Sequence, residues 1–240
     1  QKAFLALVPA AELAAVPDLQ AACRSAGIAL AGAVFPELIV NGQFVQQGVW
    51  LMPLPPGTQL FLVEALGPDA LLEAQRIAAE VRTALGDCPS SQQRPSLLLL
   101  FDGLLPNIAS VLDELYLLLA NRVEYAGANA GNESFVSMPC VFDADWLVTG
   151  GVVGALLPST PRAALAHGFR LPEHALVATS SRGNCITSID WRPAFSVYQD
   201  LLSSVYGVTL TAENFYQHGV HFPLGILQAS GDVIVRVPVG

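Results

Sequence analysis

The sequence predicts an α/β protein, with a duplicated, mixed-sheet N-terminal domain that contains βαβ units and a smaller α+β C-terminal domain. Short apolar runs of strand length alternate with segments whose apolar residues recur at helical spacing. Residues 97–126 read as strand, helix and strand, the order of a βαβ unit whose crossover makes its two strands parallel. After Pro158 the pattern changes, so we expect a second domain there.

The first part of the chain is predicted to contain buried strands and two helices. Asp69 is a suitable N-cap for the second helix, and Gly86 follows the end of that helix. The expected elements are a strand at 3–8, a helix at 17–26, strands at 28–35, 45–52 and 59–66, and a helix at 70–85.

The next part repeats this order after a polar, proline-containing loop at 88–96. A strand at 97–101 precedes a helix at 108–120, and a second strand starts at Val123. This strand is expected to run into a loop from Gly127, where small residues let the backbone approach another group closely. The loop and Asp102 would share the carboxyl edge of one sheet, where open α/β sheets bind ligands.

The two parts also resemble each other in sequence. Residues 28–37, IALAGAVFPE, resemble VEYAGANAGNE at 123–133, with Gly32 matching Gly127. Residues 40–49, VNGQFVQQGV, resemble FDADWLVTGG at 142–151, with Gly48 matching Gly150. These long offsets suit duplication of a half-domain rather than a solenoid. We therefore assign residues 1–158 to the N-terminal domain, duplicated at about 1–56 and 95–158, and residues 159–240 to the C-terminal domain.

The C-terminal domain is predicted to contain a hairpin, a helix and a final strand. Its hairpin strands are expected at 176–179 and 185–190, joined by the turn Ser181-Arg182-Gly183-Asn184. Pro193 suits the first position of a helix at 193–206, and an apolar strand follows at 233–237.

Composition narrows the classes of function. Hydrophobic residues make up 52% of the chain, but no apolar run reaches the ~18 residues that suggest a membrane span. The net charge of −9 argues against a nucleic-acid surface, which needs clustered Lys and Arg. Cys23, Cys88, Cys140 and Cys185 are widely spaced without a CxxC pair, which favours free thiols in a reducing compartment.

Several motifs in a fixed order resemble the FIST domain family. LLLLFDG, YAGANAGNESF and WLVTGGVVGALL resemble the N-terminal part of that domain. HGF, LVATSSRGNCITSIDWRPAFSVYQDLL and HFPLGI resemble its C-terminal part, which is expected to be incomplete here. The resemblance implies a cytoplasmic sensory module that binds small ligands such as amino acids and acts on a downstream signalling protein. It implies no catalytic residues, and we expect no cofactor.

The candidate ligand site supplies groups for both charges of an amino acid. Backbone N–H groups at the small-residue loop would bind a carboxylate, and Glu133 or Asp102 would accept from an ammonium group. The Arg182 guanidinium would donate two further hydrogen bonds to the carboxylate. We expect the ligand in a cleft between the two domains. The predicted ligand-binding residues are Asp102, Gly127, Asn129, Ala130, Gly131, Asn132, Glu133, Arg182 and Asn184.

Other functions stay open at this point. Cys140 or Cys185, with His167 or His174, could serve a thiol-dependent hydrolase or transferase. An interaction scaffold is a further alternative. The histidines of QHGVHF lack a nearby acidic or cysteine cluster, so we expect no metal site there. We expect no nucleic-acid partner and no membrane insertion, and the apolar strand at 233–237 favours a homo-oligomer.

Overall fold

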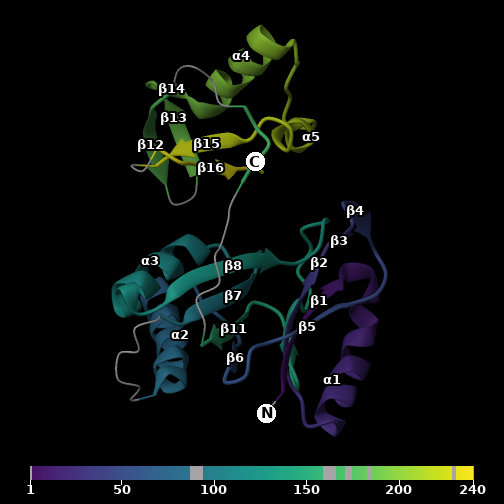
Figure 1. The fold of residues 1–240 in the computed structure, drawn as a ribbon. Coiled ribbons are helices and arrows are strands. Elements are labelled where there is room, and N and C mark those ends of the chain that lie inside the picture. The colour runs from purple at the N-terminus through teal and green to yellow at the C-terminus, as the bar shows by residue number, and fades with distance from the viewer. Residues whose placement is uncertain are drawn as a thin grey trace. The chain divides into compact units, whose positions relative to one another are not determined.

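The computed structural model describes residues 2–86, 94–158, 166–170, 175–182, 185–228 and 231–239. The chain forms two compact units, residues 1–163 and 164–240 (Figure 1). Helices and several multi-strand sheets occur together, which confirms the predicted α/β class. Among the described residues, no helix is long and apolar enough to cross a membrane.

One sheet of the N-terminal unit has the strand order β10-β9-β2-β1-β5. Strands β1 and β2 are parallel, and the 3-10 helix η1 and helix α1 connect them. Their runs AFLALVP and ALAGAVF are almost wholly apolar, as expected for strands covered on both faces. The bounds are β1 Ala3–Pro9, η1 Ala10–Ala15, α1 Val16–Ser25, β2 Ala29–Phe35, β5 Trp50–Pro53, β9 Val141–Asp143 and β10 Leu147–Val148.

The second sheet has the order β6-β11-β7-β8. Strand β11 is antiparallel to β6 and β7, and β7 is parallel to β8. Consequently β6, β7 and β8 end at the same edge, and β11 starts there. The bounds are β6 Gln59–Val63, α2 Ala70–Leu85, β7 Ser96–Asp102, α3 Ile108–Leu119, η2 Ala120–Arg122, β8 Glu124–Ala130 and β11 Val152–Leu157.

The two sheets pack face to face, and the helices cover their outer faces (Figure 1). Alternate residues of β7 enter different cores because successive side chains of a strand point to opposite faces. Leu98 and Leu100 lie in the core that includes β2 and β9, whereas Leu99 and Phe101 pack with α2 and α3. Full burial of one such side chain stabilises the fold by ~1.5–3 kcal/mol.

The same strand order occurs twice in this unit. Strand β1 lies between β2 and β5, and β7 lies between β8 and β11. Gly32 pairs with Ala6 in the fourth position of β2, and Gly127 pairs with Leu99 in the fourth position of β8. This arrangement is what a duplicated half-domain would produce, and the duplication itself stays an inference.

The halves differ in the hairpin that comes after their second strand. The hairpin of β9 and β10 pairs with β2 in the other sheet, whereas β3 (Leu38–Val40) and β4 (Gln43–Val45) pair only with each other among the described strands. Two residues, Pro36 and Glu37, separate β2 from β3, but residues 131–140 separate β8 from β9. The shorter link keeps the first hairpin at the end of β2.

The C-terminal unit contains small antiparallel sheets and a small core. The predicted hairpin is present as β12 and β13, with β14 beside β13, and β15 pairs with β16. Helix α4 packs Tyr198 and Leu202 against Leu210. The bounds are β12 Ala178–Arg182, β13 Cys185–Ile189, β14 Arg192–Pro193, α4 Ala194–Tyr206, α5 Phe215–Gly219, β15 Leu224–Leu227 and β16 Val233–Arg236.

Candidate functional site

The carboxyl edge of the β6-β11-β7-β8 sheet brings together several segments that are distant in sequence. Gly103 N–H donates to Ala130 O across 2.9 Å, which joins the ends of β7 and β8. Gly131 N–H donates to Val34 O across 2.8 Å, which joins the end of β8 to the end of β2 in the facing sheet. Both sheets therefore contribute to one edge, as the strand directions require.

Asp102 is the polar centre of this edge. Its side chain is buried, with 2% of the residue exposed. Oδ1 accepts from Leu104 N–H at 3.0 Å, and Oδ2 accepts from Gly150 N–H at 2.7 Å. A buried carboxylate needs such donors because burial removes its water. Asp102 thus holds the loop after β7 and the loop before β11, and both of its oxygens already have protein partners.

Cys140 lies next to this carboxylate. Burial, the negative charge of Asp102 and a hydrogen bond to its side chain raise the pKa of the Cys140 thiol to about 12. Through its backbone, Cys140 extends the pairing of β9 with β2 within one sheet, since Val34 N–H donates to Cys140 O at 2.8 Å. A nucleophilic cysteine needs a lowered pKa and access to substrate, so this environment disfavours Cys140 as a nucleophile.

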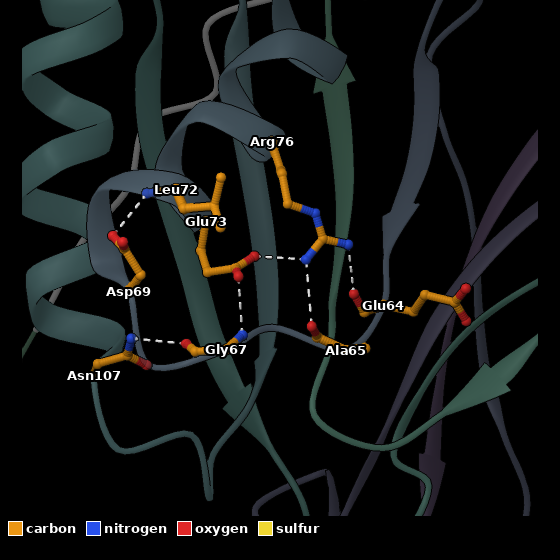
Figure 2. Close-up of polar contacts among 8 residues, drawn as sticks. All are labelled: Glu64, Ala65, Gly67, Asp69, Leu72, Glu73, Arg76 and Asn107. Carbon is orange, nitrogen blue, oxygen red and sulfur yellow. Dashed lines mark hydrogen bonds and ion pairs between the residues drawn. The ribbon is translucent and has the colours of Figure 1, made fainter.

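A second polar cluster at the same edge was missed by sequence reasoning (Figure 2). Glu73, 3% exposed, accepts from Gly67 N–H at 3.0 Å and pairs with Arg76 at 2.6 Å. Arg76 also donates to Glu64 O at 2.7 Å, and Asn107 donates to Gly67 O at 3.0 Å. These contacts fix the loop between β6 and α2. The available signal was a Glu and an Arg three residues apart after the predicted cap Asp69.

The cap of α2 is as predicted. Asp69 accepts from Leu72 N–H at 3.1 Å, and Gly86 follows the helix with a φ of +57°. The helix therefore begins at the edge in a defined position, with Glu73 in its first turn. Its N-terminus lies beside the loop after β7, to which Asn107 belongs.

The prediction that a loop begins at Gly127 is wrong. Strand β8 continues to Ala130, so Gly127, Asn129 and Ala130 lie in a strand instead. A Cβ on Gly127 would lie 2.3 Å from Leu99 O, which is the reason for glycine at this position. Asn129 is exposed on β8, and Ala130 is buried at its end.

The segment after β8 contains the remaining predicted edge residues. Gly131 uses its N–H in the bond to Val34 and has a φ of +141°, which glycine adopts readily. Asn132 closes the loop, because its side chain donates to Val136 O at 2.8 Å and accepts from Val136 N–H at 3.2 Å. Glu133 is exposed beside it. Among the predicted residues at this edge, Asn129 and Glu133 thus carry the exposed polar side chains.

The other predicted residues belong to the C-terminal unit. Arg182 is exposed at the end of β12, and Asn184 lies outside the described residues, as does His174. Cys185 is an exposed free thiol in β13, and Cys23 and Cys140 are buried free thiols. The predicted cleft between the domains stays a prediction.

Two cavities in the described part of the chain lie away from the carboxyl edge. A shallow cavity of about 360 Å³ lies at the opposite end of β2, lined in part by Arg24, Ile28 and Asp143. Another of about 290 Å³ lies between β6 and α2 near Phe61 and Glu80. The described residues contain no cluster of three or more His, Cys, Asp or Glu that could hold a metal ion.

Comparison with known proteins gives one family. The model of the FIST N domain matches residues 4–192, most of the chain, and extends past the N-terminal unit into β14. No curated protein and no solved structure matches the chain significantly. The matched segment includes strands of both N-terminal sheets and the whole carboxyl edge described above. The chain therefore belongs to the FIST N domain family, whose members are sensory signal-transduction domains.

Proposed function

We propose that this protein is a cytoplasmic sensory module that binds an amino acid or a related small carboxylate at the carboxyl edge of β7 and β8. The proposal rests on this one edge, where the ends of β2, β6, β7 and β8 come together. Two polar side chains, Asn129 and Glu133, are exposed there. Such edges are the usual ligand sites of α/β sheets.

The proposed roles follow from the chemistry of the groups. Glu133 accepts from the ammonium group of the ligand, and the Asn129 amide donates to its carboxylate. Asp102 acts indirectly, because its oxygens hold Leu104 and Gly150 and so keep the surrounding loops in place. Arg182 stays a predicted charged donor to the ligand.

Because Asp102 bonds to two loops, a ligand that shifts one of them would alter the other. We propose that this coupling passes the binding event to a downstream signalling protein. A change of state needs a ligand with different affinities for two arrangements of the edge. The bond between Gly131 and Val34 extends the same coupling to the facing sheet.

The test is a thermal-shift panel of amino acids and small carboxylates on the full chain. A ligand at about one hundred times its dissociation constant stabilises a protein by ~2.7 kcal/mol. For a chain of this size the melting temperature then rises by roughly 5–10 °C. Native mass spectrometry of freshly purified protein would identify a ligand that copurifies.

Matched variants locate the site. Glu133→Gln and Asn129→Ala should reduce the shift, whereas Asp113→Asn, an exposed acid on α3, should leave it unchanged. Arg182→Ala tests the contribution of the C-terminal unit. A panel without any shift, or a shift that Glu133→Gln and Asn129→Ala leave intact, would contradict this site.

The thiol-dependent enzyme is the less supported alternative. The raised pKa of Cys140 keeps its sulfur protonated near neutral pH, and a thiol is a far weaker nucleophile than a thiolate. A thiol-reactive probe should therefore label Cys185, which is exposed, faster than Cys140. Fast labelling of Cys140 in the folded protein would favour the enzyme. The interaction scaffold stays a prediction.

A further inference from the structure

Strand β8 has an open edge. It is the outermost described strand of its sheet, with β7 on one side only. Glu124 N–H donates to Pro95 O, and Ala130 O accepts from Gly103 N–H, so the even-numbered residues bond to β7. The N–H and C=O groups of Tyr125, Gly127 and Asn129 consequently point outward, because backbone groups of a strand alternate in direction.

This edge lacks the features by which proteins usually prevent pairing with another strand. Strand β8 reads EYAGANA, with no proline, no lysine and no bulge against β7. Its one charged residue, Glu124, is at its start and pairs with Arg94 at 3.3 Å. Gly127, Ala128 and Asn129 are exposed and small, so another backbone can come close.

The hairpin that would cover this edge by internal symmetry does not reach it. In the first half, the matching edge of β2 is covered by β9, whose residues pair with Ala31, Gly32 and Ala33. The corresponding hairpin for β8 is β3 and β4, which pair only with each other among the described strands. Its two-residue link to β2 is too short for the same crossing.

Helix α3 extends the open edge with an apolar flank. Leu112 is 39% exposed and Tyr116 is 56% exposed, and they lie four residues apart on one side of the helix. The Tyr116 ring lies 5.9 Å from the ring of Tyr125 on β8, so this side faces the open edge. The opposite flank of α3 faces α2, where Arg82 donates to Leu118 O.

We propose that β8 is the contact strand of a symmetric homodimer, in which two copies pair antiparallel about Gly127. Gly127 then faces Gly127 of the second copy, and Tyr125 faces Asn129, so the outward-pointing residues exchange both backbone hydrogen bonds. Glu124 faces Ala130, so no like charges meet. Leu112 and Tyr116 of the two copies flank the joined strands and add apolar contact.

In an isologous interface the same surface of each copy forms the contact. Antiparallel pairing of β8 with β8 of the second copy has this symmetry. A strand edge alone is small compared with stable interfaces, which bury about 800 Å² on each partner. The apolar flank of α3 is therefore a necessary part of the contact. The dimer does not require the ligand, although Asn129 supplies its backbone to the contact strand and its side chain to the proposed ligand site.

Sedimentation velocity of the full chain over a concentration series tests the proposal. We expect a dimer, and Asn129→Pro should weaken dimerisation by about thirtyfold, since two symmetry-related hydrogen bonds are lost. The proline removes an outward N–H and leaves the bonds to β7 in place. Asn129→Ala keeps that N–H, so it should remain dimeric although it loses the proposed ligand contact.

Helix variants give an independent second test. Tyr116→Glu should weaken the dimer, whereas Leu117→Glu, on the same helix but 74% exposed on its outer side, should not. Circular dichroism checks that each variant is folded. In hydrogen exchange, the amides of Tyr125, Gly127 and Asn129 should become protected as concentration rises.

Specific results would overturn the proposal. A wild-type chain that stays monomeric at the highest soluble concentration excludes it. A dimer that folded Asn129→Pro and Tyr116→Glu both retain would place the contact elsewhere, for example at β16, which is an edge strand of its two-stranded sheet. If Asn129→Pro is unfolded, the exchange pattern and Tyr116→Glu decide the question.

Discussion

Cys140 and Asp102 show how a single neighbour sets the chemistry of a side chain. The thiol is 1% exposed, and the adjacent carboxylate makes its ionised form still less favourable. Asp102 in turn is held by backbone donors from two loops. These residues are buried at the edge, whereas Asn129 and Glu133 are exposed there.

The raised pKa of Cys140 predicts a stability that depends on pH. In the unfolded chain the thiol ionises near pH 9, whereas in the folded protein it ionises at about 12. Its contribution is complete below pH 9 and is lost as pH rises to 12, with a slope of about 1.4 kcal/mol per pH unit. Cys140→Ala should reduce the alkaline decrease in the free energy of unfolding by that slope.

Urea unfolding at several alkaline pH values measures this slope. The comparison of slopes is unaffected by the cavity that the substitution creates, because the cavity costs the same at every pH. Cys23→Ala serves as the comparison, since burial alone raises the pKa of Cys23. Equal slopes for the wild type and Cys140→Ala would contradict the prediction.

Gly127 predicts a packing effect at one position. Its Cβ would lie 2.3 Å from Leu99 O, a backbone atom that cannot move without disturbing β7. Gly127→Ala should lower the free energy of unfolding by ~1–3 kcal/mol. Gly168→Ala is the control, because nothing lies within 4 Å of its Cβ, and it should change stability by less than about 0.5 kcal/mol. Similar melting temperatures for the two variants would refute this interpretation.

Among the elements, α2 depends on its first turn. Asp69 caps the helix, and Glu73 connects that turn to the β6–α2 loop through Gly67 and Arg76 (Figure 2). The start of α2 and the loop after β7 are therefore held as one structure, since Asn107 donates to Gly67 O. At its β6 side the carboxyl edge is held by these hydrogen bonds, whereas at its β8 side the residues Gly127, Ala128 and Asn129 are exposed.

Loss of the Glu73 carboxylate should lower the free energy of unfolding, because the β6–α2 loop loses its link to the first turn of α2. Glu73→Ala leaves the Gly67 N–H without its acceptor and removes the ion-pair partner of Arg76, which costs ~1–3 kcal/mol of folding free energy. Glu80→Ala makes the same change at an exposed position of α2 and should cost less than about 0.5 kcal/mol. Chemical denaturation of both variants gives the comparison, and equal losses would argue against the cluster.

For the whole molecule, each unit has its own core. The two larger clusters of buried residues lie within residues 1–163, and the small cluster around Tyr198 and Leu202 lies in the C-terminal unit. Residues 1–163 expressed alone should therefore unfold cooperatively. Calorimetry should give a melting temperature within a few degrees of the main transition of the full chain. A fragment without a cooperative transition would show that the units depend on each other.

Local patterns were enough to predict most elements and the class of the fold. Apolar runs such as LLLLF predicted buried strands, and Asp69 and Gly86 predicted the ends of α2, because caps and periodicity are properties of neighbouring residues. The motif order indicated the family, and the match to the FIST N domain confirmed it. The direction of β7 and β8 followed from their short helical connection.

Only the tertiary structure decided which polar residues are buried and which are available. Gly127 looks the same in sequence whether it lies in a loop or in a strand, and the contact with Leu99 O decides between them. Sequence also does not show the donors to Asp102, because the N–H groups at positions 104 and 150 come from different loops. Nor does it show the pKa of Cys140, which depends on the nearby Asp102 carboxylate. Hydrogen bonds and burial between distant residues depend on how the sheets pack, and no local pattern encodes that packing.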